Sequence, residues 1–254
     1  MKTKFHLCTC GSCRHPEWSC IRSGSLKSAE FPAHFAVIEH PDHGLILFDT
    51  GYADQLTKAT QKWPYRAYSM LFPFQIPADQ EAITQLHQLG YAASDVKWIV
   101  ISHFHPDHIA GLKDYPLARF ICSRLAWEAL HQRRGWNALK EGFLPDLLPS
   151  DMIGRTRWIE DAPDWHLQDT LPGFNTGKDL FGCGSLIAIS LPGHAVGQYG
   201  LYLRNITGDK PVFLVADACW RSESYRHYVL PPSITLALLH DAAAFNILGK
   251  RFRS

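Results

Sequence analysis

The sequence lacks a strong net charge and any long apolar run. Its 254 residues carry a formal charge of +1, so the charge balance predicts neither nucleic acid nor an anionic membrane as a partner. No stretch reaches the roughly 18 apolar residues that a membrane-spanning helix needs. The N-terminus carries lysines but no apolar run of signal-peptide length. These absences predict a cytoplasmic protein without a membrane segment.

The sequence also lacks internal repeats and low-complexity segments, and its number of cysteines is odd. Hydrophobic residues make up 46% and charged residues 19% of the chain, as in a folded globular protein and not in a disordered one. The length suits one large domain, and we interpret residues 1–254 as a single domain. Seven cysteines without an export signal predict free thiols or metal ligands instead of a disulfide framework. The sequence leaves the oligomeric state open.

Cysteines are concentrated in the N-terminal segment 1–30. Their spacing could bind a separate zinc ion, although it contains no paired CxxC arrangement and has no partner pair elsewhere. The alternative is that they are thiols in a loop near the mouth of an active site. The residues concerned are Cys8, Cys10, Cys13 and Cys20, with His6 and His15 close by.

Alternating apolar patterns predict several β-strands. Apolar runs at 35–40 and 45–49 flank the residues Pro-Asp-His-Gly and predict a β-hairpin. Segment 135–184 has little periodicity and suggests a long insertion near a site. Further strand patterns lie at 97–101, 118–122, 185–191, 200–203 and 211–216.

Helical spacing occurs between these strands, over residues 79–89, 123–133 and 233–248. Asp79, Ser123 and Ser233 are candidate N-caps, since their side chains can accept hydrogen bonds from the first turn of a helix. Strands punctuated by helices predict sheets covered by helices, an α/β layer arrangement.

Histidine is in excess, with 14 residues, and the segment WIVISHFHPDHIAG (98–111) concentrates it. An apolar strand runs directly into His103, His105, Asp107 and His108. Alternate residues of an extended chain point the same way, so His103 and His105 can reach one metal together. Asp107 and His108 follow where the chain turns and can face a second metal. Zinc accepts both imidazole and carboxylate ligands, so this cluster predicts a metal site.

The string HFHPDH resembles the HxHxDH signature of the metallo-β-lactamase superfamily. Three more segments resemble motifs of that family, in the same order along the chain. They are LILFDTG (45–51), LPGHAVGQYG (191–200) and FLVADA (213–218). The resemblance implies an αββα sandwich.

The resemblance also implies a ligand set. His103, His105 and His194 would hold a first metal, Asp107 and His108 a second, and Asp217 would bridge both. Asp49 would fix a metal-bound histidine or the loop around it, or it is purely structural. We expect one or two zinc ions per chain, although iron and manganese fit the same ligands.

The activity implied is hydrolysis of a small-molecule substrate by a metal-activated water, with Asp107 orienting that water or taking its proton. An ester or lactone is the first expectation. The alternatives are a thioesterase similar to glyoxalase II and a non-enzymatic metal-binding or regulatory module.

Two positions depart from the family pattern. Relatives supply a further histidine near the C-terminus, whereas after Asp217 this chain has only His227 and His240, neither at a predicted strand end. We therefore expect either a truncated C-terminus or a second metal site that is incomplete or completed otherwise. Acyl-homoserine lactonases of this fold resemble one another in a tyrosine three residues after the bridging aspartate, where this chain has Trp220. This difference weakens a direct lactonase assignment.

Overall fold

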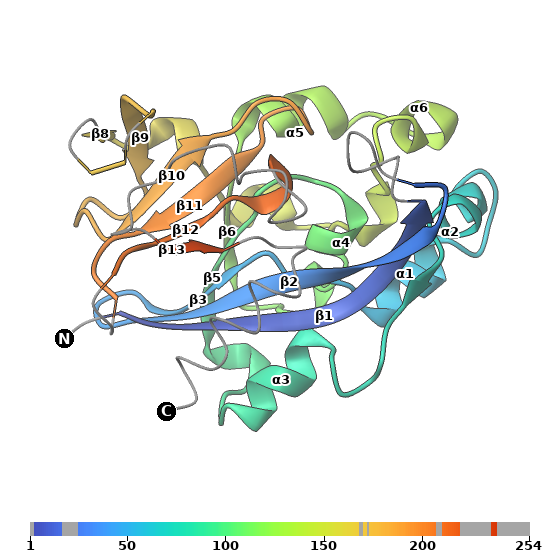
Figure 1. Ribbon diagram of the computed structural model, residues 1–254, viewed down its shortest axis with the longest axis horizontal. Coiled ribbons are helices and arrows are strands. Elements are labelled where there is room, and N and C mark those ends of the chain that lie inside the picture. Colours follow the sequence, from blue (N-terminus) through green and yellow to red (C-terminus); the bar gives the residue numbers. More distant parts are fainter. Residues whose placement is uncertain are drawn as a thin grey trace.

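Two mixed β-sheets pack face to face at the centre of the protein (Figure 1). The computed structural model describes residues 3–16, 25–167, 170–171, 173–206, 210–218 and 235–237. None of the helices in these ranges is long and apolar enough to cross a membrane.

The first sheet has the strand order β4-β1-β2-β3-β5-β6-β7. Strands β1, β2 and β3 pair antiparallel, and the predicted hairpin is confirmed, with His40 opposite Gly44. Strands β3, β5, β6 and β7 are parallel, so their carboxyl ends lie at one edge. The strands are β1 (Lys4–Pro16), β2 (Ser28–His40), β3 (Gly44–Phe48), β4 (Phe74–Gln75), β5 (Val96–Val100), β6 (Arg119–Cys122) and β7 (Thr156–Trp158).

The second sheet has the order β13-β12-β11-β10-β9-β8 and is antiparallel apart from the β12–β13 pair. Its central strands match the predictions at 185–191, 200–203 and 211–216. The strands are β8 (Asp164–His166), β9 (Thr176–Asp179), β10 (Leu186–Ser190), β11 (Tyr199–Leu203), β12 (Val212–Leu214) and β13 (Thr235–Ala237).

The helix predicted over 233–248 is wrong at residues 235–237, which form β13 alongside β12. Hydrogen bonding to the exposed edge of β12 satisfies the backbone there, and such tertiary pairing overrides a local helical pattern. The remainder of that prediction lies outside the described residues.

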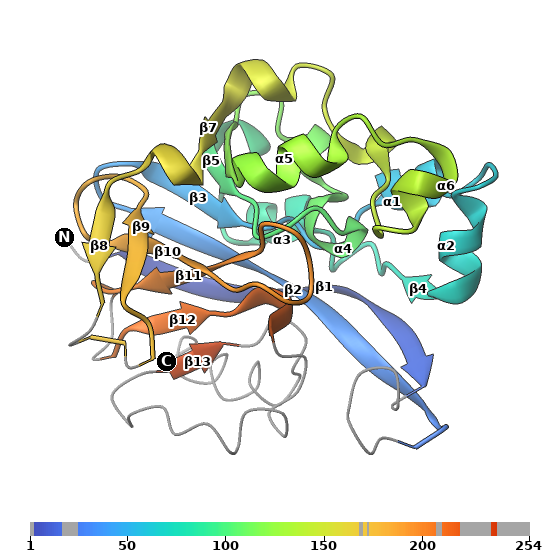
Figure 2. The same cartoon turned by 90° about the horizontal axis from the view of Figure 1, so that it is seen from above.

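Helices cover the outer face of the first sheet (Figure 2). The predictions at 79–89 and 123–133 correspond to α3 and α5. The side chain of Ser123 caps α5 by accepting a hydrogen bond from the backbone N–H of Ala126 at 3.2 Å, whereas α3 begins after Glu81 and not at Asp79. The helices are α1 (Asp54–Ala59), α2 (Arg66–Leu71), α3 (Ala82–Gln88), α4 (Pro106–Ile109), α5 (Arg124–Leu130) and α6 (Gly135–Leu139).

The described parts of segment 135–184 consist of short helices, 3₁₀ turns and strands that belong to the two sheets, so this segment connects the sheets and is not an insertion. It contains α6 and the strands β7, β8 and β9. The 3₁₀ turns of the chain are η2 (Ala93–Asp95), η3 (Leu112–Asp114), η4 (Pro145–Leu147), η5 (Met152–Arg155), η6 (Ile159–Asp161) and η7 (Ala216–Ala218).

Period-two alternation along the strands separates the apolar layers. In β3, Leu45 and Leu47 face the helices, while Ile46 and Phe48 face the second sheet. A third cluster, which includes Ile187, lies on the other face of the second sheet. Each such buried side chain stabilises the fold by about 1.5–3 kcal/mol relative to an exposed one. The described residues thus provide one helical layer and both sheets of the predicted αββα sandwich.

The described N-terminal cysteines lie on strand β1 and not in the expected loop, although Cys13 does line a pocket. Cys8 pairs with Phe35 and Cys13 with Phe31 in the β1–β2 ladder, and all three described cysteines of β1 are buried and form no disulfide. They form no metal-binding group within the described ranges. Cys20 lies outside these ranges.

Candidate metal centre

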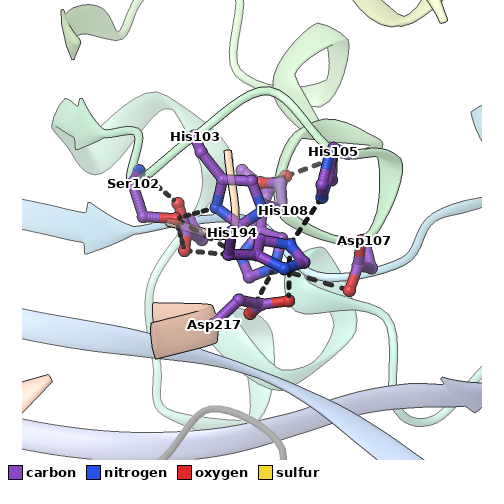
Figure 3. A network of polar contacts seen from close by, with 10 residues as sticks. Ser102, His103, His105, Asp107, His108, His194 and Asp217 are labelled. Carbon is purple, nitrogen blue, oxygen red and sulfur yellow. Dashed lines mark hydrogen bonds and ion pairs between the residues drawn. The ribbon is translucent and has the colours of Figure 1, made fainter. Parts of the chain in front are cut away.

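Loops from both sheets converge on one cluster of histidines and aspartates (Figure 3). His103 and His105 follow β5, and His194 follows β10. The other members lie in the short turns α4 and η7, which carry Asp107, His108 and Asp217. The fold therefore brings together all six side chains that the sequence predicted as ligands.

One group of possible ligands consists of His103, His105, His194 and Asp217, whose ligand atoms all lie within 4.8 Å of one another. His194 Nε2 is 2.8 Å from His105 Nδ1 and 3.3 Å from Asp217 Oδ2. The imidazole nitrogens thus point into a common space.

A second group consists of Asp107, His108 and Asp217. His108 Nε2 lies 3.4 Å from Asp107 Oδ2 and 3.1 Å from Asp217 Oδ1. Asp217 belongs to both groups and directs one oxygen to each, as a bridging carboxylate would.

Asp49 fixes the tautomers of two of these histidines. Its Oδ2 accepts a hydrogen bond from Ser102 Oγ at 2.7 Å and lies 2.8 Å from His108 Nδ1. Because the Ser102 hydroxyl donates to the carboxylate, the 3.0 Å contact between Ser102 Oγ and His103 Nδ1 makes that nitrogen the donor. The Nε2 lone pair of His103 therefore faces the cluster, and Asp49 holds the Nδ1 proton of His108, so that Nε2 of His108 is the nitrogen directed to the cluster.

The buried donor set fits a metal cation. His103 Nε2 is buried and has no hydrogen-bond partner, which is costly unless another group takes its lone pair. Burial and the neighbouring His108 hold the pKa of His103 well below its usual value, and burial lowers the pKa of His105 to about 4. Both rings are therefore neutral and able to act as ligands near pH 7.

The charges around His108 favour a cation at the second group. Burial lowers the pKa of His108, but Asp107, Asp217 and Asp49 outweigh burial and raise it well above its usual value. Burial also raises the pKa of Asp49, against the opposing hydrogen bonds from His108 and Ser102. This excess of negative charge in a buried place is what a divalent metal would neutralise.

Two residues beside the cluster adopt a left-handed backbone conformation that favours glycine, Asp49 at φ 62° and Ala216 at φ 47°. Such conformations cost about 1–3 kcal/mol each and are often found at functional sites. Here they direct the carboxylates of Asp49 and Asp217 toward the histidines.

An open pocket with about 590 Å³ of empty space lies against the metal cluster. Its metal side consists of His105, Asp107, His194 and Asp217, and Gly142 packs there, since a Cβ at that residue would lie 2.9 Å from the His105 ring. The aromatic wall of the pocket consists of His15, Phe31, Tyr52, Tyr68 and Phe72.

A further group that could hold a metal by proximity, His40, His43 and Cys183, lies at the turns after β2 and β9. The Nδ1 of His40 accepts hydrogen bonds from the backbone N–H groups of Asp42 at 3.1 Å and His43 at 3.2 Å. The proton of this ring is therefore on Nε2, 2.9 Å from Ser185 Oγ. A protonated nitrogen cannot bind a cation, so His40 is a hydrogen-bonded structural residue.

Several site residues could not be identified from the sequence alone. Ser102 is adjacent to His103, but nothing in its spacing indicates the link to Asp49, which is 53 residues away. Tyr52, Tyr68 and Phe72 reach the pocket only through the fold. The predictions that concern Trp220, His227 and His240 lie outside the described residues.

Comparison with known proteins gives one family. The chain matches the metallo-beta-lactamase superfamily over residues 30–232. The N-acyl homoserine lactonase AttM of Rhizobium radiobacter is 27% identical over 212 residues, which cover 83% of this chain and 74% of AttM. The probable metallo-hydrolase Rv2300c of Mycobacterium tuberculosis is 30% identical over 173 residues, which cover 65% of this chain and 50% of that protein.

Solved structures share the fold at low sequence identity. An N-acyl homoserine lactone hydrolase with the product N-hexanoyl-L-homoserine at its catalytic metal centre has a TM-score of 0.68 at 19% identity, covering 100% of this chain and 90% of the other. AidC, a dizinc quorum-quenching lactonase, has a TM-score of 0.64 at 14% identity over 94% and 88%. The four sequence motifs and the fold agree with this family match, so the chain belongs to the metallo-beta-lactamase superfamily.

Proposed function

We propose that the protein is a metal-dependent hydrolase that opens a lactone or a related ester with a metal-activated water. The observation that carries this proposal is the pair of ligand groups that share Asp217 and border an open pocket. The N-acyl homoserine lactonases among its relatives support a lactone as the substrate.

His103, His105 and His194 would hold one metal, Asp107 and His108 a second, and Asp217 both. When bound, the metals lower the pKa of water and polarise the scissile carbonyl. Asp107 would accept the proton of the attacking water, because its carboxylate belongs to the second ligand group and the residue also lines the pocket. The aromatic wall would hold the acyl part of the substrate away from solvent.

Zinc is the proposed metal, supported by the nitrogen and oxygen ligands and by the dizinc centre of AidC. In the described residues the first group has three histidines, whereas the second has one histidine and two aspartates. We therefore expect the second zinc to bind more weakly. Metal analysis after dialysis against a mild chelator measures the difference, and two equally retained ions would contradict it.

The pocket argues against a glutathione thioester. Within the part of the chain that the structure describes, no lysine or arginine lines this pocket, and the glutathione carboxylates would lack cationic partners there. Its aromatic wall suits an uncharged acyl group instead.

Hydrolysis assays on the zinc-loaded protein test the proposed function. N-Hexanoyl-L-homoserine lactone should be opened, with one proton released per turnover, while a glutathione thioester should react much more slowly. The Asp217→Asn variant is the matched control, since it removes the shared charge at nearly constant side-chain size. If the protein held zinc and hydrolysed no lactone or ester, the non-enzymatic alternative would replace our proposal.

A further inference from the structure

Exposed apolar side chains gather at the end of the molecule that carries helices α2 and α6 (Figures 1 and 2). The backbone N–H of Gly135 in α6 donates a hydrogen bond at 2.9 Å to the hydroxyl of Tyr65, which precedes α2. The rings of Trp63 and Trp136 lie 6.2 Å apart. We call this surface the α2–α6 face. Its large apolar side chains are Trp63, Met70, Leu71 and Trp136, with exposed fractions of 61%, 63%, 67% and 57%.

Positive charge accompanies these apolar side chains. Segments 62–71 and 134–140 contain four basic and no acidic residues, whereas the whole chain has a formal charge of only +1. The adjacent Glu141 is already paired with Arg133, at 3.0 Å. The net charge of the chain therefore does not reveal this basic face. Its four basic residues are exposed and form no ion pair with any described residue: Lys62, Arg66, Arg134 and Lys140.

Exposed tryptophans beside lysines and arginines suit the boundary of a lipid bilayer. Tryptophan rings concentrate at the level of the headgroups, aliphatic side chains enter the acyl region, and basic residues are attracted to anionic headgroups. A second copy of the chain is a poorer occupant. In a symmetric dimer the face would meet itself, and four cations from each copy would oppose one another without acidic partners. Charge complementarity thus favours anionic lipid.

The α2–α6 face also adjoins the metal centre. A cavity with about 970 Å³ of empty space is lined by Phe72 at the end of α2 and by Leu139 of α6. The same cavity is lined by His105 and His194 of the first ligand group. An apolar molecule taken up at this face therefore lies close to the metal ligands.

We propose that the α2–α6 face docks on a membrane surface that contains anionic phospholipid. The four apolar side chains insert at the level of the headgroups, and the four cations contact the lipid phosphates. This docking goes beyond the proposed hydrolysis and does not depend on it. For a hydrolase it has a clear use, because it places the cavity beside the bilayer, where long-chain substrates accumulate.

Flotation with lipid vesicles tests the docking on the zinc-loaded protein. Vesicles of mixed phosphatidylglycerol and phosphatidylcholine should bind the protein about tenfold or more tightly than vesicles of phosphatidylcholine alone. Binding to the mixed vesicles should weaken as salt rises from about 0.1 to about 0.5 M, because salt screens the attraction between the cations and the headgroups.

Substitutions on the face separate the two contributions to binding. Lys62→Gln combined with Arg66→Gln should weaken binding to the mixed vesicles by roughly 10- to 30-fold, since each cation near an anionic surface contributes about a fivefold gain in affinity. Met70→Ser combined with Leu71→Ser should weaken it by about tenfold or more, because less apolar area is buried in the lipid. Thermal midpoint and zinc content identify any misfolded variant, and Trp136→Ser on α6 then tests the apolar contribution independently.

Leu117→Ser combined with Ile153→Ser is the matched control, since these apolar side chains are exposed by 68% and 53% and belong to neither segment of the face. It should bind the mixed vesicles as the wild type does. The proposal is overturned if the wild type does not bind the mixed vesicles, or if the control weakens binding as much as the changes at Met70 and Leu71. A dimer in light scattering that those changes dissociate, without vesicle binding, would overturn it in favour of a second copy. Vesicle binding requires no turnover, so a failure to hydrolyse lactones would refute the proposed function alone.

Discussion

Among the three groups of possible metal ligands in the described residues, two differ in the protonation of their histidines, and of these two one alone presents an unprotonated imidazole nitrogen to a cation. The cluster of His103, His105, His194 and Asp217 and that of His40, His43 and Cys183 both place their ligand atoms within 4.8 Å of one another. The Nδ1 of His103, the ring nitrogen that faces away from the cluster, donates a hydrogen bond to Ser102. The Nδ1 of His40 instead accepts two hydrogen bonds from backbone N–H groups.

The difference shows that the hydrogen bond made by Nδ1 of an imidazole decides whether Nε2 carries a proton or can bind a cation. When Nδ1 donates, the lone pair is on Nε2 and faces the cluster. When Nδ1 accepts, the ring proton is on Nε2. Proximity alone therefore overstates the number of metal sites.

The largest effect is expected from removing a ligand of the first group. His103→Ala and His194→Ala should each lose most of the bound metal and reduce turnover by more than the roughly 100-fold seen for residues that only support ligands. Water alone cannot replace an imidazole that is anchored in place. Metal analysis and lactone hydrolysis measure both effects. Metal content and turnover equal to those of the wild type would refute the ligand assignment.

Asp107→Asn should separate catalysis from metal binding. The amide keeps the size of the carboxylate but loses its charge and basicity, so turnover should fall by about 100-fold or more. Metal at the group containing His103 should be retained. A rate equal to that of the wild type would show that Asp107 is structural.

Asp49→Asn should make the metal centre resemble the His40 cluster. An amide N–H directed at His108 Nδ1 would turn that nitrogen into an acceptor and move its proton to the cluster side. We expect zinc affinity to fall by roughly 10- to 100-fold, as measured by competition with a chromophoric chelator. Ser102→Ala, which leaves the contact between Asp49 and His108 in place, should have a smaller effect. Unchanged affinity in Asp49→Asn would refute the tautomer argument.

The smallest effect on metal is expected from His40→Gln. The amide can accept one of the backbone N–H groups and donate to Ser185, so the protein should keep its zinc content and lactone turnover. Stability should fall by about 1 kcal/mol as one buried hydrogen bond is lost. Loss of a zinc equivalent in this variant would show that the His40 cluster does bind metal.

The six ligands could be predicted because their spacing is local. His103, His105, Asp107 and His108 lie within six residues, and His194 and Asp217 each follow a strand that has a recognisable pattern. The placement of Cys13 on β1 and the helix that failed at 235–237 depended on strand partners far along the chain. Such pairing leaves no local signal. The cytoplasmic location and the roles of the individual ligands remain predictions.

Asp49 has one carboxylate oxygen that serves both metal groups, directly through His108 and through Ser102 to His103. A cation on His108 would polarise the N–H of its ring and draw negative charge from that oxygen. The oxygen would then be a weaker acceptor for the Ser102 hydroxyl, which supports His103. Mutual repulsion between the cations, which share Asp217, acts in the same direction. If both positions bind metal as proposed, occupancy of one would therefore lower the affinity of the other, and the centre would fill in two separate steps as the free metal concentration rises.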